Sequence, residues 1–200
     1  MSNQLVFYVR SSAFDRARAL TFEDDMIRFD DKDRIGQTEP SIAWKDFDGV
    51  RMGVKWVKGY VFVIGRIYCI DIRSSKGEKI KIRLKSIYGI NKDRIDGKFK
   101  DIVNALYDRI LDEVITHQVQ LVEKDGCAEI AGVQVTSKGV RWNKGMVVSW
   151  NDLEIKAFTN YFAIFQKSIP GNYKALEYVD EWNCHVLYSV ITLLLQHKAC

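Results

Sequence analysis

The most regular charged pattern in the sequence is a row of basic residues at every second position: Lys79, Lys81, Arg83 and Lys85. The positions between them are apolar, from Ile80 to Leu84. A period of two predicts an antiparallel strand with one apolar face on a core and one polar face. The polar face has two interpretations. It is either a docking surface for phosphate groups, nucleic acid or an acidic protein, or only the solvated side of a strand.

Two further lysines flank a tryptophan earlier in the chain: Lys55, Trp56 and Lys58. An aromatic side chain between lysines can anchor a protein interface or stack on a nucleic-acid base. Positive charge is concentrated here, because residues 51–85 carry ten basic and two acidic residues, whereas residues 22–48 carry nine acidic and four basic. We therefore predict a basic binding face that consists of the row with Lys55 and Lys58, and we take Trp56 as a candidate aromatic anchor.

Calcium ligation is not expected from the acidic loop that precedes this region. Asp31, Asp33 and Gly36 fit three positions of a calcium-binding loop. Ile35 and Ile42, however, stand where two further oxygen ligands are required. A solvated loop accounts better for these residues.

The end of the chain carries four residues of types that bind zinc: Cys184, His185, His197 and Cys200. On one helix, His185 and His197 would lie about 18 Å apart at 1.5 Å per residue, which is too far to share an ion. We therefore predict no metal site.

Nucleophilic catalysis also lacks a recognisable pattern. Cys69 lies in a predicted strand, where a free cysteine behaves as a small hydrophobic residue. None of the three histidines forms a catalytic group with its neighbours in the sequence, and neither of the two common glycine-rich phosphate-binding loops occurs. The sequence therefore predicts a non-enzymatic protein without a cofactor.

Hydrophobic period and turn residues predict the elements that must position these side chains. We expect strands at residues 4–9, 41–53, 60–72 and 79–85, a hairpin at 19–29, and a turn at 74–77. Apolar residues then recur at helical spacing over residues 95–115, with Asp96 as the amino-terminal cap.

The second half of the sequence repeats the first. Val133–Trp142 aligns with Leu20–Phe29 without a gap, and Gln120–Val122 echoes Gln4–Val6. A closing helix is expected at residues 180–197. This repeat predicts two small homologous domains, residues 1–116 and 117–200.

The same tetrapeptide pattern precedes a strand in both halves: Trp44-Lys45-Asp46-Phe47 and Trp150-Asn151-Asp152-Leu153. With the strand order, the strand-turn-strand of residues 59–86 and the terminal helix, the chain resembles the pleckstrin-homology-like (PH-like) superfold in its bacterial form. The resemblance implies an α+β fold of two tandem PH-like domains, each an antiparallel sheet or partly open barrel closed by an amphipathic helix. It also implies a binding module, since proteins of this class mostly bind phosphoinositides, peptides or partner proteins.

Four scattered cysteines, no signal-peptide pattern and no Asn-x-Ser/Thr sequon predict a cytoplasmic location. The longest apolar run, Val186–Leu195, is about half the length needed to span a membrane, so no transmembrane segment is expected. We expect a protein-binding adaptor or inhibitor, of which toxin-neutralising immunity proteins are one example. The alternative is binding of anionic lipid headgroups, or another phosphate-bearing surface, through the basic face. No nucleic-acid partner is expected.

Overall fold

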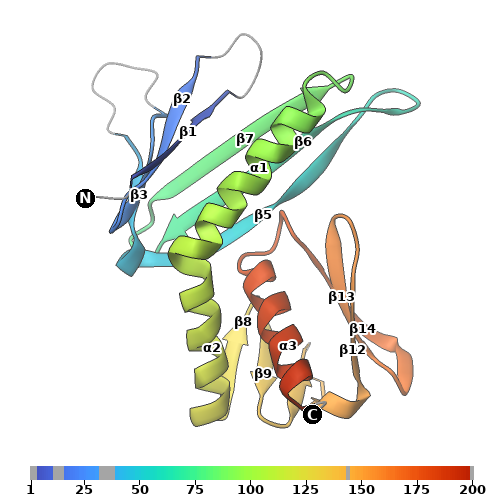
Figure 1. The fold of residues 1–200 in the computed structure, drawn as a ribbon. Helices are drawn as coiled ribbons and strands as arrows, with labels where there is room; N and C mark the ends of the chain where they lie inside the picture. Colours follow the sequence, from blue (N-terminus) through green and yellow to red (C-terminus); the bar gives the residue numbers. More distant parts are fainter. Residues whose placement is uncertain (1–3, 11–15, 32–38, 143–144, 199–200) are drawn as a thin grey trace. The chain divides into compact units, whose positions relative to one another are not determined.

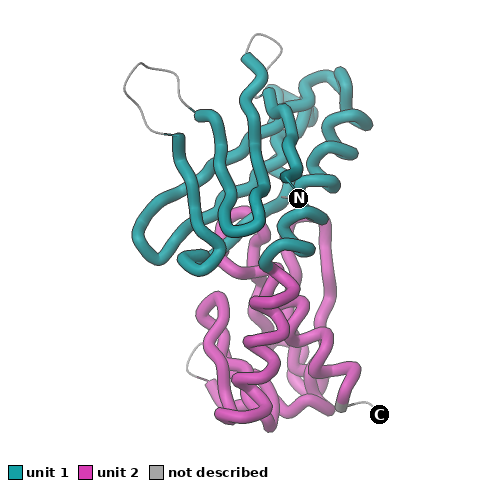
Figure 2. Tube along the Cα trace, turned by 60° about the vertical axis from the view of Figure 1, so that its left-hand side comes forward, with its two compact units in different colours: residues 1–110 teal, residues 111–200 magenta. Residues whose placement is uncertain are grey.

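A computed structural model describes residues 4–10, 16–31, 39–142 and 145–198. The chain forms two compact units, residues 1–110 and 111–200, which are teal and magenta in Figure 2. Each unit contains antiparallel sheets and helix, so the fold belongs to the α+β class that the sequence predicts. The strand order of every sheet is linear, and within the described residues no sheet closes on itself.

Unit 1 begins with a four-stranded antiparallel sheet in chain order: β1 (Leu5–Val9), β2 (Arg18–Phe22), β3 (Met26–Phe29) and β4 (Ser41–Ala43). Leu20, Phe22 and Ile27 are fully buried, as expected where side chains of alternate strand positions share the core face. The N–H of Glu23 donates to the Met26 carbonyl at 2.8 Å and closes the turn between β2 and β3. The predicted hairpin at residues 19–29 is confirmed.

A single 3₁₀ turn, η1 (Trp44–Asp46), leads into the second sheet of this unit. The Trp44 indole donates to the Glu23 carbonyl at 3.1 Å and fixes the bend. The strand predicted at 41–53 is therefore bent into two elements at this tryptophan. The second sheet is antiparallel and again in chain order: β5 (Phe47–Lys58), β6 (Val63–Ser74) and β7 (Lys79–Ile87).

The strand predicted at residues 60–72 is wrong at its start. The N–H of Gly59 donates to the Phe62 carbonyl at 2.7 Å, so residues 59–62 form the turn between β5 and β6. Strand β5 instead runs on to Lys58. Aromatic and β-branched residues favour strands, but the same residue types also occupy this exposed turn.

One face of the second sheet is apolar and forms the core of unit 1. Ile70, Ile72, Ile80 and Ile82 on this face are fully buried. Helix α1 (Lys92–Leu106) contacts β7, and Figure 1 shows it lying along the sheet. The Phe99 and Tyr68 rings pack at 5.2 Å between centroids.

The helix after β7 is longer than predicted, and two details were wrong. It begins at Lys92 after Asn91, and Asp96 does not cap it but pairs with Lys100 at 2.8 Å. After a π-helical turn, η2 (Tyr107–Leu111), the chain continues as α2 (Asp112–Lys124). The segment Gln120–Val122 therefore lies in a helix, not in a strand that echoes Gln4–Val6.

Unit 2 has the same order of elements in shorter form. Its four-stranded sheet consists of β8 (Cys127–Ile130), β9 (Val133–Thr136), β10 (Gly139–Arg141) and β11 (Val148–Ser149). After η3 (Trp150–Asp152), its three-stranded sheet consists of β12 (Leu153–Ala157), β13 (Tyr161–Gln166) and β14 (Ile169–Glu177). Helix α3 (Cys184–Lys198) packs against α2 and β8. Within the described residues, no helix is long and apolar enough to cross a bilayer.

The two tryptophan motifs make equivalent hydrogen bonds. The Trp150 indole donates to the Ser137 carbonyl at 3.2 Å, as the Trp44 indole does to a carbonyl of the corresponding hairpin. The N–H of Ser75 donates to the Asp46 carbonyl at 2.9 Å, and the N–H of Lys167 donates to that of Asp152 at 2.7 Å. The sequence repeat therefore coincides with a repeated local geometry.

Candidate binding surface

The predicted basic row lies on strand β7 and points away from the core. Ile80 and Ile82 of the same strand are fully buried, so the alternate positions face the other side. Lys79, Lys81 and Lys85 are exposed, whereas the side chain of Arg83 is only 32 % exposed. The strand period thus places all four basic residues together, as the sequence predicts.

Strand register adds basic residues from β5 and β6 to this face. Arg73 pairs with Lys79, Arg51 and Lys81 both pair with Asp71, and Lys55 lies opposite Ile67. Cross-strand partners project from the same side of a sheet. We call the resulting surface the basic sheet face: Arg51, Lys55, Arg73, Lys79, Lys81, Arg83 and Lys85.

Asp71 is buried in the middle of the basic sheet face, at 3 % exposure. Arg51 Nε donates to Asp71 Oδ2 at 2.9 Å, and Arg83 Nη1 lies 2.5 Å from Asp71 Oδ1. A buried carboxylate without partners would be strongly unfavourable, so the guanidinium groups of Arg51 and Arg83 compensate the charge of Asp71. The carboxylate in turn fixes their position on the sheet.

Arg83 has a second anchor in the sheet itself. Its Nη1 also donates to the Ile82 carbonyl at 2.8 Å. Burial disfavours the charge on Arg83, but the hydrogen bond to the Asp71 carboxylate, together with the charge interactions with Cys69 and Asp71, raises the Arg83 pKa above its ordinary value. Arg83 is therefore a fixed positive charge at the centre of the face.

The outer cations of the face point to solvent. Among the described residues, Lys79, Lys81 and Lys85 have no carboxylate within ion-pair distance. Arg73 Nε pairs with Asp48 Oδ2 at 2.6 Å at the edge of the sheet. The three lysines are consequently available to a negatively charged partner.

Trp56 does not belong to this surface. It pairs with Arg66 on the opposite side of the sheet, and the Arg66 guanidinium lies 4.7 Å from the centre of its indole ring. Lys58 follows a register shift at the end of β5. Of the residues predicted around the tryptophan, only Lys55 therefore joins the basic row. Lys55 precedes Trp56 by one position and so lies on the opposite face of β5, whereas Lys58 is two positions beyond Trp56. The sequence alone does not show this, because it does not show that the strand continues to Lys58.

Arg51, Arg73 and Asp71 were not predicted as members of the site. Asp71 lies 20 residues from Arg51 and 10 from Lys81 in the sequence. Asp71 and Arg73 are two residues apart on β6 and therefore share a face, but this spacing needs the strand register before it can be combined with β7.

Two of the cysteines are buried in the described chain, Cys69 in β6 and Cys184 at the start of α3. Burial raises the pKa of Cys69, partly opposed by Arg83, and raises that of Cys184 to about 12, so both are protonated thiols at neutral pH. Within the described residues, no three His, Cys, Asp or Glu side chains are grouped to hold a metal ion. Most of the acidic loop after Asp31, and Cys200, lie outside those residues. His185 stacks on Tyr178 at 4.6 Å.

The corresponding face of unit 2 is aromatic rather than basic. Phe47 of β5 pairs with Ser74 of β6, and the equivalent pair in unit 2 is Leu153 of β12 with Gln166 of β13. Counted back from these pairs, Ala163 on β13 occupies the position of Asp71 on β6. Phe165 stacks on Tyr173 at 5.6 Å, and Lys156 Nζ lies 5.5 Å from the Phe165 ring. The concentration of cations is therefore a property of unit 1.

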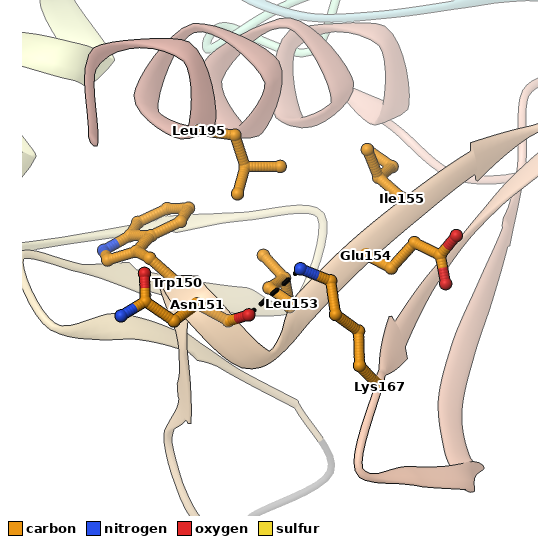
Figure 3. A pocket seen from close by; sticks show the side chains of 7 residues that line it. All are labelled: Trp150, Asn151, Leu153, Glu154, Ile155, Lys167 and Leu195. Atoms are coloured by element: carbon orange, nitrogen blue, oxygen red, sulfur yellow. Dashed lines mark hydrogen bonds between the residues drawn. The ribbon is translucent and has the colours of Figure 1, made fainter. Parts of the chain in front are cut away.

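Unit 2 also contains a pocket of about 410 Å³ between η3, β12 and α3. Figure 3 shows the Leu195 side chain over the pocket, opposite Trp150 and Leu153. Lys167 Nζ donates to the Asn151 carbonyl at 3.0 Å at its rim, and Glu154 supplies the opposite charge. The lining of this pocket therefore carries one charge of each sign.

Comparison with family models, curated proteins and solved structures finds no match for the chain.

Proposed function

We propose that the chain is a non-enzymatic protein-binding module of two tandem PH-like domains, and that the basic sheet face binds an acidic surface of a partner protein. The observation that carries this proposal is the presence of seven basic side chains on one sheet face around a single buried carboxylate. Complementary charge steers two proteins together and fixes the register in which they bind.

The PH-like part of the proposal is supported by the plan of each unit. A four-stranded antiparallel sheet, a 3₁₀ turn with a tryptophan, a three-stranded antiparallel sheet and a helix follow one another twice. An adaptor or an inhibitor, including one that neutralises a toxin, fits such a module, because an inhibitor needs a rigid complementary surface and no catalytic group.

The rigidity of the surface also supports binding. Arg51 and Arg83 are fixed by Asp71, and the sheet fixes the spacing of the lysines. A preorganised surface loses less conformational entropy when it binds. The three solvent-facing lysines then supply most of the charge that a partner meets first.

Affinity capture from cells of the native host tests the proposal. The tagged protein is compared with a basic-face variant, Lys79→Gln, Lys81→Gln and Lys85→Gln. The matched control removes three exposed lysines elsewhere: Lys45→Gln, Lys124→Gln and Lys138→Gln. We expect the wild type and the control to capture the same acidic protein at low salt, and the basic-face variant to lose it.

Two results would contradict the proposal. The first is a basic-face variant that captures the same protein as well as the wild type does. The second is a partner that the control variant loses equally, which would show that total charge and not the face decides binding. Circular dichroism confirms in parallel that each variant is folded.

A further inference from the structure

The turn between β5 and β6 projects four consecutive apolar side chains into solvent. Tyr60 is fully exposed, and Val61, Phe62 and Val63 are 84 %, 66 % and 51 % exposed. Single exposed apolar residues are ordinary, but a continuous group of them at the end of a rigid hairpin marks an interaction site. Tyr60 and Val61 in particular contribute little apolar burial to folding.

The adjacent turn between β7 and α1 extends this apolar surface. Tyr88 and Ile90 are 71 % and 64 % exposed. The N–H of Tyr88 donates to the Ile64 carbonyl at 2.7 Å, which ties the two turns together. Figure 1 shows both turns at the same end of the sheet. We call this surface the apolar end: Trp56, Tyr60, Val61, Phe62, Val63, Tyr88 and Ile90.

A pocket of about 180 Å³ lies within the apolar end and carries positive charge. Trp56, Val63 and Tyr88 line it together with Arg66 and Lys92. Outside the basic sheet face, the segments 54–67 and 85–92 contain three basic residues, Lys58, Arg66 and Lys92, and no acidic residue. The two turns therefore carry cations, and the first acidic residues beyond them, Asp93 and Asp96, lie in α1, where Asp96 interacts with Arg66.

We propose that the apolar end inserts into the interface of an anionic lipid bilayer. Aromatic side chains with an apolar body and a polar edge settle at the headgroup level, and valine and phenylalanine side chains enter the acyl boundary. Lys58, Arg66 and Lys92 then lie at the level of the lipid phosphates. Basic residues beside an inserted apolar segment each add to the attraction of an anionic leaflet.

The shape and charge of the apolar end favour a bilayer over a second copy of the chain. Two copies that met through this surface in a symmetric dimer would bring the same cations together, which is unfavourable. A bilayer, by contrast, accepts a protruding hairpin without a matching groove. The observation is independent of the basic sheet face, so the proposal does not rest on the protein-binding function.

Sedimentation with lipid vesicles tests the insertion. The vesicles are phosphatidylcholine, either pure or with about a third phosphatidylserine. The tip variant is Tyr60→Ser, Val61→Ser and Phe62→Ser, whose side chains are exposed and not needed for the core. The matched control replaces exposed apolar residues of unit 2: Met146→Ser, Val147→Ser and Ile169→Ser.

We expect the wild type and the control to sediment with the anionic vesicles and much less with the neutral ones. The tip variant should bind the anionic vesicles at least about tenfold more weakly, because three apolar side chains no longer leave water. The double variant Lys58→Gln, Lys92→Gln should bind the anionic vesicles more weakly than the wild type, by about fivefold for each lysine. Raised salt should remove this difference between the variant and the wild type.

Each of three results would overturn the proposal. The wild type could fail to sediment with anionic vesicles, the tip variant could bind as well as the wild type, or binding to neutral vesicles could be equally strong. A tip variant that instead changes the oligomeric state, or loses a protein partner while vesicle binding is absent, would reassign the apolar end to a protein interface.

Discussion

Asp71 is the residue on which the geometry of the basic sheet face depends. It is the acidic side chain that register places between Arg51 and Lys81, and it is almost completely buried. Its carboxylate compensates the charge of two arginines that the sheet holds close together. The face is therefore organised by one negative charge, although its outer surface is positive.

Replacing Asp71 with asparagine should destabilise unit 1 by about 3 kcal/mol, because both guanidinium groups lose their buried counter-charge. Urea denaturation of the two proteins measures this. Asp48→Asn is the matched control, since Asp48 pairs with Arg73 at the exposed edge and should change stability by less than about 1 kcal/mol. Equal effects of the two substitutions would show that burial of the pair does not matter.

Asp152 provides a test of the turn between β13 and β14. The Ser168 hydroxyl, followed by the Gln166 amide and the Ser168 N–H, holds the pKa of this carboxylate below its ordinary value. A lowered pKa stabilises the folded state above the unfolded-state pKa, near pH 4, and the contribution disappears as the pH falls through the folded-state pKa.

Asp152→Asn should therefore lower the free energy of unfolding at pH 7 and have a smaller effect at pH 3. Urea denaturation at the two pH values gives both differences. An effect of the same size at both pH values would mean that hydrogen bonding to the charged carboxylate is not the stabilising interaction.

At the scale of elements, local pattern was sufficient where a period was regular. The strict alternation of residues 79–85 predicted β7, and the two tryptophan tetrapeptides marked the entry to a strand in each half, where the structure has η1 and η3. Local pattern gave a wrong result at Gln120–Val122, which was matched to the strand at Gln4–Val6. Val122 lies seven residues after Ile115, and both are buried residues of helix α2. Two helical turns at this spacing were a stronger signal than the three-residue echo of Gln4–Val6.

The site was predicted only in part for a related reason. The sequence shows which residues share a face of one strand, but not which strands are neighbours or in what register. Arg51 and Arg73 could join Lys79 and Lys81 only after β5, β6 and β7 were aligned. The same alignment separated Trp56 from Lys55, which lie on opposite faces although they are adjacent in the chain.

Two glycines test how the elements pack. A Cβ on Gly139 would overlap the Val148 carbonyl oxygen across the β10–β11 pair, so Gly139→Ala should destabilise unit 2 by more than about 1 kcal/mol. Gly97 lies in α1 with open space at its Cβ position, and Gly97→Ala should stabilise by up to about 1 kcal/mol. Thermal unfolding should show a lower melting temperature for Gly139→Ala and a higher one for Gly97→Ala. An unchanged melting temperature for Gly139→Ala would contradict the close approach of β10 and β11.

At the scale of the whole molecule, the two units share an order of elements but not a surface. The three-stranded sheet of unit 1 carries the basic sheet face, whereas that of unit 2 carries Phe165, Tyr173 and a single lysine at equivalent register. The shared strand order and tryptophan motifs account for the fold of both units. They do not account for the cations, which are concentrated on unit 1 alone. This difference assigns the proposed partner to unit 1.

We propose that charge on the basic sheet face drives association with an acidic protein. The most direct test of this claim is the association rate with the captured partner, measured against salt concentration for the wild type, the basic-face variant and the control variant. We expect the wild type and control to associate fast at low salt and to slow steeply as salt rises. The basic-face variant should associate about tenfold more slowly at low salt and respond less to salt. Equal rates and an equal salt response in all three proteins would contradict the claim.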